Sequence, residues 1–184
     1  MRRSAGLFGV IVVMAVLCVA SPRPPLGAAK PSASGATWKV YFSPRGGATA
    51  AVVKAIDGAR RTVLAQAYSF TSAPIAKALL NAHKRGVKTL VILDKSQVTQ
   101  KYSSATFLSN AGVPTRIDAA HAIAHNKVMV IDGQTVITGS FNFTRAAEER
   151  NAENLLIVRD KTLADAYARN WKAHERHSRV YRGK

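Results

Sequence analysis

The sequence predicts an α/β protein whose mixed β-sheet is sandwiched between helices, and three observations support this class. Residues 87–93 (VKTLVIL) form a nearly continuous apolar run, which is typical of a central strand buried on both faces. Strand-like and helix-like apolar patterns alternate along most of the chain. Residues 125–142 instead contain two β-branched runs around Asp132-Gly133, a strong signal for an antiparallel hairpin. A sheet with both parallel and antiparallel strands accommodates all three observations.

The elements follow from local patterns in chain order. Strands are expected near 38–42, 62–70, 87–93 and 114–117, then as a hairpin within 125–142, and near 153–158. Helices are expected between them: one with Val52, Val53, Ile56 and Ala59 on its apolar face, one opened by Pro74 and closed by Gly86, one over 104–111 that stops at Gly112, and a last one presenting Leu163, Tyr167, Trp171 and His174. The two kinds of element together account for most of the chain after residue 36.

A spaced set of polar residues lies on the predicted hairpin. The pattern H-x-K-x4-D-x6-G-S-x-N is made by His125, Lys127, Asp132, Gly139, Ser140 and Asn142. An imidazole, an ammonium, a hydroxyl and a carboxamide together suit an anionic phosphodiester, because they supply a nucleophile, positive charge and hydrogen-bond donors. The sequence therefore predicts a phosphodiesterase site on this hairpin.

Strand alternation indicates how these groups face one another. His125 and Lys127 share one face of their strand, and Ser140 and Asn142 share one face of the return strand. A two-residue loop at Asp132-Gly133, or one placed a residue later, gathers all four on one face, whereas a three-residue loop would not. Asp132 lies at an odd offset from His125, so we expect it to have a structural role at the turn.

The motif resembles the signature of the phospholipase D superfamily, the HKD motif. Residues 65–94 and 139–154 extend the similarity to short bacterial endonuclease-like members, which carry one motif per chain. The resemblance implies the phospholipase D-like fold and a phosphohistidine intermediate. It also implies a supporting carboxylate at Glu153, which would orient an imidazole, and a structural role for Gly139. Tyr68 and Ser69 either line the site or belong to a packed strand end.

The count of motifs predicts a homodimer with a shared active site. In-line displacement at phosphorus needs a nucleophile on one side and a proton donor to the leaving oxygen on the other. Neither His83 nor His174 begins a second H-x-K motif followed by an acidic residue. A second His125 must then come from a partner subunit across a two-fold axis.

No cofactor and no metal are expected at this site. No cluster of acidic residues accompanies the motif to hold magnesium or calcium, which prefer oxygen ligands. His121 and His125 are four residues apart, but they lie on a predicted loop and strand rather than on a helix, which makes a poor zinc site. His174 and His177 are expected to be solvated within a basic helical tail.

The N-terminus predicts export. Residues 1–29 have the pattern of a signal peptide, with Arg2-Arg3 before an apolar core and cleavage expected after Ala29 or Ala20. Residues 30–36 are expected to be a flexible linker, and residues 37–184 the catalytic domain. The protein is then periplasmic or secreted; an uncleaved membrane anchor is the alternative. Cleavage would remove the lone cysteine, Cys18.

Charge favours a polyanionic substrate. The chain has a formal net charge of +17, and residues 1–29 contain three arginines and no acidic residue, so cleavage leaves +14. A basic surface attracts DNA or RNA through phosphate neutralisation. We therefore expect a non-specific nuclease acting on DNA or RNA. The alternatives are a phospholipase D acting on phospholipid headgroups, disfavoured because the sequence suggests no exposed aromatic stripe near the motif, and a catalytically silent nucleic-acid-binding module.

Overall fold

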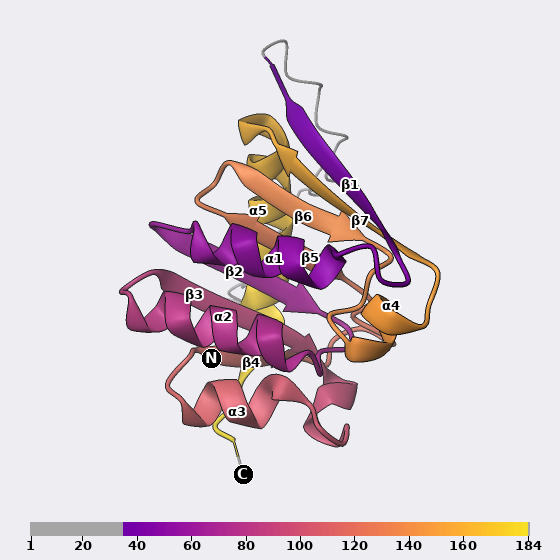
Figure 1. Ribbon diagram of the computed structural model, residues 1–184. Helices are drawn as coiled ribbons and strands as arrows, with labels where there is room; N and C mark the ends of the chain where they lie inside the picture. Colours follow the sequence, from indigo (N-terminus) through magenta and orange to yellow (C-terminus); the bar gives the residue numbers. More distant parts are fainter. Residues whose placement is uncertain (1–34, 184) are drawn as a thin grey trace, which may run out of the picture.

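An eight-stranded mixed sheet forms the centre of the computed structural model, which describes residues 35–183 (Figure 1). Its strands are β1 (Thr37–Ser43), β2 (Thr62–Ala67), β3 (Lys88–Asp94), β4 (Thr115–Asp118), β5 (Lys127–Ile131), β6 (Thr135–Gly139), β7 (Glu153–Arg159) and β8 (Arg179–Val180). They lie in the order β1-β7-β6-β5-β2-β3-β4-β8. The predicted α/β class with a mixed sheet is confirmed.

The direction of each strand follows from what connects it to the next. β2, β3 and β4 are parallel neighbours, and each crossover between them contains a helix, as parallel pairing requires. β5 and β6 are joined by a tight turn and are antiparallel. β5 also pairs antiparallel with β2, so the hairpin is attached directly to the parallel part of the sheet.

Helices cover both faces of the sheet. They are α1 (Ala48–Asp57), α2 (Ala73–Lys84), the 3-10 helix η1 (Lys95–Val98), α3 (Ser104–Asn110), α4 (Arg145–Glu149) and α5 (Lys161–His177). The apolar faces of α1, α2 and α3 pack on one side of the sheet with Met129 and Ile137, and Figure 1 shows these helices on that side. α5 packs on the other side, against Val128, Val130 and Val136. The sheet is therefore sandwiched as predicted.

Three short elements were not predicted from the sequence: η1, α4 and β8. Each is too short to show an apolar period. α4 is defined instead by its N-cap, where the Thr144 hydroxyl accepts a hydrogen bond from the N–H of Ala147 at 3.1 Å. β8 lies near the C-terminus and is defined by its pairing with β4, which is distant in the sequence.

The predicted hairpin is present, but its expected register is wrong. Met129 pairs with Ile137 and Ile131 with Thr135, so three residues, 132–134, form the loop. Asp132 and Gly133 both take positive φ angles, 54° and 65°, and Gln134 adds one residue to the return strand. The regular pairing ends near Gly139, and the residues after it are therefore not positioned by simple strand alternation.

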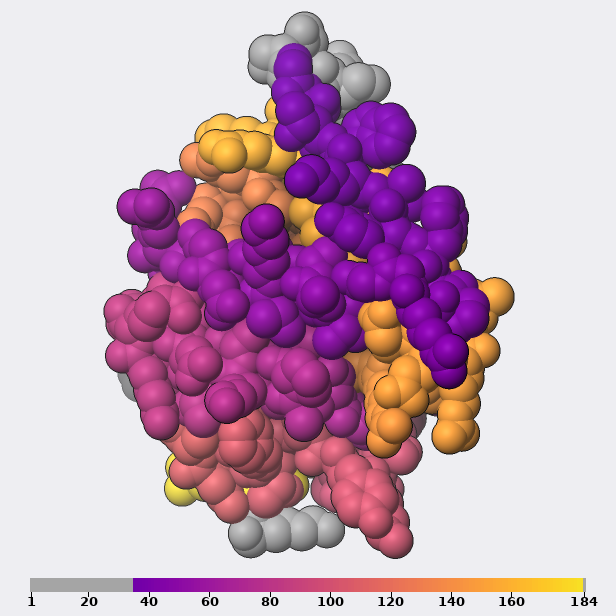
Figure 2. Space-filling view, viewed as in Figure 1, coloured from indigo at the N-terminus to yellow at the C-terminus, as the bar shows by residue number. Residues whose placement is uncertain are grey.

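The edge strand β1 exposes a stripe of large apolar side chains. Trp38 and Phe42 are 66% and 64% exposed, and Val40 lies between them on the same face. Phe42 pairs with Asn154, one residue from Glu153, so the stripe reaches the strand that carries this carboxylate. Ser43, the partner of Glu153, alternates with Phe42 along β1, so the stripe faces the opposite side of the sheet from the Glu153 side chain. Figure 2 shows the side chains of this strand along one margin of the molecule.

The expected signal peptide, its cleavage sites and most of the linker lie outside the described residues. Within residues 35–183, no helix is both long enough and apolar enough to cross a membrane.

Candidate active site

The motif residues lie at one end of the sheet, where several strand ends meet. Lys127 begins β5 and pairs with Ala67, the last residue of β2. Glu153 begins β7 and pairs with Ser43, the last residue of β1. Because Lys127 and Glu153 occupy the same side of the sheet as the Met129 core, their side chains lie toward a common region beyond the helices.

His125 and Lys127 are in direct contact. The Lys127 Nζ lies 3.0 Å from Nδ1 and 2.9 Å from Nε2 of the His125 ring, and it donates to the His125 carbonyl oxygen at 3.0 Å. The ring of Tyr68 packs on the imidazole, with centroids 4.6 Å apart. The imidazole is exposed, whereas the lysine is only 6% exposed. An imidazole open to solvent thus lies beside a buried positive charge.

Two opposing effects act on the pKa of Lys127. Burial lowers the pKa of its ammonium, because the charged form loses water. The Glu153 carboxylate acts in the opposite direction and offsets part of this decrease. Glu153 therefore acts on the site through the charge of Lys127, while its own side chain accepts a hydrogen bond from Asn151 at 3.1 Å.

Ser140 is anchored to β7 rather than to the lysine. Its Oγ accepts a hydrogen bond from the backbone N–H of Asn154 at 3.0 Å, and its own N–H donates to the Asn154 Oδ1 at 3.2 Å. Gly139 makes this approach possible: its φ is +147°, and a Cβ there would lie 2.3 Å from the Asn154 carbonyl oxygen. Any other residue at 139 would force the two segments apart.

Asn142 has a buried and unpaired side-chain oxygen. Phe141 and Phe143 on either side of it are core residues with 1% and 0% exposure, which fixes the intervening backbone. Within residues 35–183, the Asn142 Oδ1 is buried and has no hydrogen-bond partner. Buried polar atoms are normally paired, so this amide is available for a ligand or a partner chain.

Asp132 lies at the opposite end of the hairpin and holds the turn. Its carboxylate accepts hydrogen bonds from the backbone N–H groups of Arg60, Arg61 and Thr62 at 3.0, 2.8 and 2.9 Å. Burial alone would raise the pKa of this carboxyl, but the three hydrogen bonds outweigh it and leave the pKa below its usual range. Asp132 is thus separated from His125 by the length of β5.

Two supports of His125 were not predicted from the sequence. The Asp94 Oδ2 accepts a hydrogen bond from the N–H of Ala124 at 2.7 Å, which fixes the loop just before His125. The Asn126 carbonyl accepts from the Tyr68 N–H at 2.8 Å, which fixes the residue just after it. The role of Asp94 could have been suspected from the sequence, because it is an acidic residue at the end of a buried strand.

The expectation that His174 and His177 are solvated is wrong for His174. Its side chain is only 15% exposed, and its Nδ1 lies 2.7 Å from the fully buried carboxylate of Asp118. His177 is 37% exposed and contacts the same oxygen at 3.2 Å. The signal available in the sequence was the H-x-x-H spacing, which brings two imidazoles to one side of a helix.

Comparisons with known proteins agree with this geometry. Residues 52–174 match the family described as "Cardiolipin synthase, PLD-like domain". A phospholipase D of Rickettsia felis is 47% identical over 130 residues, which cover 71% of this chain and 65% of that protein. A mitochondrial cardiolipin hydrolase of Xenopus laevis is 36% identical over 115 residues, 62% of this chain and 55% of the relative. The match thus spans less than two thirds of either relative.

A solved structure shows the same fold. Nuc from Salmonella typhimurium, a phospholipase D family member, superposes with a TM-score of 0.78 at 38% identity, over 81% of this chain and 100% of Nuc. The family match covers well over half of the chain and includes every residue of the motif from His125 to Glu153. The chain therefore belongs to the phospholipase D superfamily.

Proposed function

We propose that this protein hydrolyses phosphodiester bonds of DNA or RNA, with the His125 imidazole as nucleophile. The observation that carries the proposal is the contact between the exposed imidazole and the buried Lys127 ammonium, 2.9 Å from a ring nitrogen. A phosphate drawn to this ammonium would present its phosphorus to the imidazole. The chemistry needs a nucleophile and positive charge, and both come from side chains.

The reaction is proposed to proceed in two displacements. An imidazole nitrogen attacks phosphorus, forming a P–N bond while the bond to the leaving oxygen breaks. Lys127 and the amide N–H group of Asn142 stabilise the charge on the nonbridging oxygens, and the Ser140 hydroxyl donates a hydrogen bond to them. Water then attacks the phosphohistidine and restores the imidazole. Glu153 supports Lys127 and orients an imidazole.

A second histidine is needed to protonate the leaving oxygen and to activate the water. We propose that it is the His125 of a partner subunit in a homodimer with one shared active site. The exposure of His125 supports this arrangement, since a partner can approach its ring. The buried, unpaired amide oxygen of Asn142 also supports a site that is completed by another molecule.

Nucleic acid is the favoured substrate because of the charge of the chain. The full chain carries 27 Lys and Arg against 10 Asp and Glu, and this excess attracts a polyanion independently of its sequence. Nuc, a phospholipase D family member that is 38% identical and is covered over its full length, supports a phosphodiesterase of that family. We further propose that the protein acts outside the cytoplasm, after removal of the N-terminal segment.

A phospholipid hydrolase is the second candidate, and one observation favours it. The exposed stripe of Trp38, Val40 and Phe42 lies on β1, the strand next to the one that carries Glu153, and such a stripe can enter a lipid surface. The relatives named phospholipase D and mitochondrial cardiolipin hydrolase support the same candidate.

One experiment tests both candidates. Untagged protein is incubated in excess EDTA with plasmid DNA, with RNA, and with vesicles of phosphatidylcholine and cardiolipin. The proposal predicts cleavage of nucleic acid, its loss by several orders of magnitude in His125→Asn, and its retention in His83→Asn, a histidine on α2 outside the site. Cleavage of lipid alone would establish the second candidate. Activity that requires added metal, or that persists in His125→Asn, would reject the histidine mechanism.

A further inference from the structure

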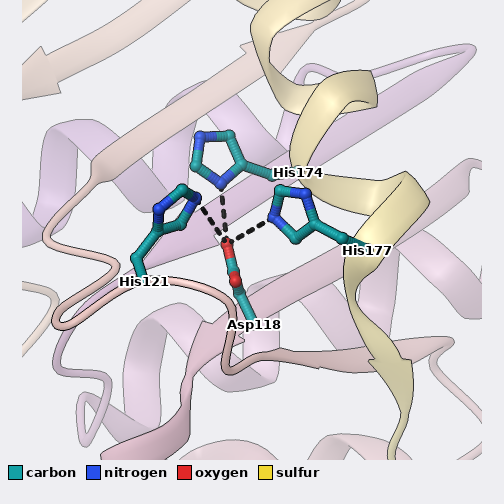
Figure 3. Close-up of side chains that lie close together, drawn as sticks. All are labelled: Asp118, His121, His174 and His177. Carbon is teal, nitrogen blue, oxygen red and sulfur yellow. Dashed lines mark hydrogen bonds and ion pairs between the residues drawn. The ribbon is translucent and has the colours of Figure 1, made fainter.

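Four potential metal ligands converge at the C-terminal end of β4. Asp118 is the last residue of β4, His121 follows it in the connecting loop, and His174 and His177 lie at the C-terminal end of α5. Figure 3 shows the three imidazoles directed at one carboxylate oxygen from two separate segments of the chain. None of these residues belongs to the HKD motif.

The distances define a small, centred cluster. The Asp118 Oδ2 lies 2.7 Å from the His174 Nδ1, 3.2 Å from the His177 Nε2 and 3.9 Å from the His121 Nε2. All four ligand atoms lie within 4.8 Å of one another. Ligands of a tetrahedral zinc ion are about 3.3 Å apart, given bonds of about 2.0–2.1 Å, so small side-chain movements would enclose an ion.

Hydrogen bonding within the cluster does not account for all three histidines. The other carboxylate oxygen of Asp118, Oδ1, already accepts a hydrogen bond from the N–H of Ala120 at 3.0 Å, which fixes the carboxylate. His174 and His177 are within hydrogen-bond distance of Oδ2, but His121 at 3.9 Å is too distant. Its ring nevertheless faces the same oxygen, with ring centroids 5.0 Å from His174 and 5.2 Å from His177.

We propose that Asp118, His121, His174 and His177 bind one divalent transition-metal ion of the zinc class. Three imidazole nitrogens and one carboxylate oxygen form a four-ligand set that suits zinc, whereas magnesium and calcium prefer oxygen ligands. The Asp118 carboxylate is completely buried and held by Ala120, while His121 and His177 are partly exposed. The site thus combines a fixed anionic ligand with an open path for the ion.

The function of this ion is structural. It would tie the end of α5 to the loop over residues 119–126, and this loop contains His125. The Lys95 Nζ already holds the His121 carbonyl at 3.0 Å, so the loop has a second attachment beside the cluster. With four protein ligands the ion has no open position for substrate, and phosphodiester chemistry at His125 does not depend on it.

The test uses untagged full-length protein, because a histidine tag binds the same metals. After demetallation and incubation with Zn²⁺ alone, the wild type should retain one zinc per chain after desalting. Zinc in hundredfold excess over its Kd should raise Tm by about 5 °C or more. Co²⁺ in place of zinc should give the visible absorption of tetrahedral coordination.

Matched variants separate the site from adventitious binding. His177→Ala should abolish the zinc-dependent rise in Tm and most of the bound zinc. His121→Ala, which removes no hydrogen bond to Asp118, should do the same. His83→Ala should keep both the rise in Tm and the bound zinc. Retention of less than about 0.2 zinc per chain by the wild type, or equal retention by His177→Ala and His83→Ala, would overturn the proposal. Nuclease activity is assayed separately, in EDTA and at a temperature well below Tm. Its loss or survival tests the proposed histidine mechanism, whereas zinc binding tests the metal site.

Discussion

Ser140 and Asn154 exchange two hydrogen bonds across the end of β6. The Asn154 N–H donates to the Ser140 Oγ at 3.0 Å, and the Ser140 N–H donates to the Asn154 Oδ1 at 3.2 Å. Because the hydroxyl oxygen is used as an acceptor, its hydrogen remains available as a donor. The pairing therefore fixes the position of Ser140 without consuming the proton that a phosphate oxygen would need.

Ser140→Ala should lower kcat/KM by about 10²-fold, because one donor to the transition-state oxygens is lost. Ser140→Thr keeps the hydroxyl and should recover most of the activity. Steady-state kinetics of both variants on the same nucleic acid, with Tm measured in parallel, check this expectation. Equal losses in the alanine and threonine variants would show that the hydroxyl does not take part in the reaction.

Glu153→Gln should move the alkaline limb of the pH profile to lower pH. Burial lowers the pKa of Lys127, and the Glu153 carboxylate opposes that decrease, so its neutralisation lets the ammonium lose its proton earlier as pH rises. The profile of kcat/KM reports this group in the free enzyme. Glu149→Gln removes an exposed carboxylate paired with Arg145 and should leave the limb in place. An unmoved limb in Glu153→Gln would contradict the proposed coupling.

Asp132→Asn should lower stability at neutral pH by about 1.5–3 kcal/mol, because charged hydrogen bonds to three backbone N–H groups are replaced by weaker ones. The pKa of Asp132 is lowered in the folded state, so its stabilisation is fully present above the unfolded pKa of about 3.9. It is lost as pH falls through the folded value. Urea unfolding of both proteins between pH 7 and pH 2 should show curves that converge in acid; a constant difference would exclude the carboxylate as the cause.

Binding to nucleic acid should weaken steeply with salt. The net charge of +17, or +14 after the proposed removal of residues 1–29, predicts several phosphate contacts, and log K should fall with log salt with a slope of several units. Fluorescence anisotropy with labelled DNA, using His125→Asn to prevent cleavage, gives the slope. A small phosphodiester with one phosphate is the control, since its KM should change little over the same range. A flat response with DNA would argue against a polyanionic substrate.

Inactive subunits should abolish the activity of the mixed dimers that they form with wild-type subunits. When wild-type chains are refolded with an excess of His125→Asn chains, nearly every wild-type chain is paired with a subunit that lacks the second imidazole. Activity per wild-type chain should then fall toward zero, whereas an equal excess of His83→Asn chains should leave it unchanged. Activity that follows the number of wild-type chains, or a fully active monomer in sedimentation, would exclude a shared site.

Local patterns predicted most of the fold. The buried run of β3 and the amphipathic faces of α1 and α5 are visible within a few residues, so these elements were expected correctly. The register of the hairpin was not predicted correctly, because it depends on the two left-handed residues Asp132 and Gly133 followed by one extra loop residue. A shift of one residue reverses the faces, and the sequence of the turn does not fix it.

The candidate site likewise contains one contact that the sequence predicted and others that it did not. His125 lies two residues before Lys127, the first residue of β5, and their contact could be expected from strand alternation. The pairing of Ser140 with Asn154 arises after Gly139 interrupts the strand, and the cluster around Asp118 joins β4 to α5. Such contacts depend on how distant segments pack, and a short sequence pattern contains no information on that packing.

The pairing of β1 with β7 has a consequence for how the protein acquires its structure. Thr37 pairs with Arg159 and Ser43 with Glu153, so the first strand of the described chain must wait for residues synthesised near its end. Contacts of such sequence separation form slowly, and an unpaired apolar strand is prone to association while it waits. Trp38 and Phe42 therefore lie on an unpaired strand until the segment that begins with Glu153 has been synthesised.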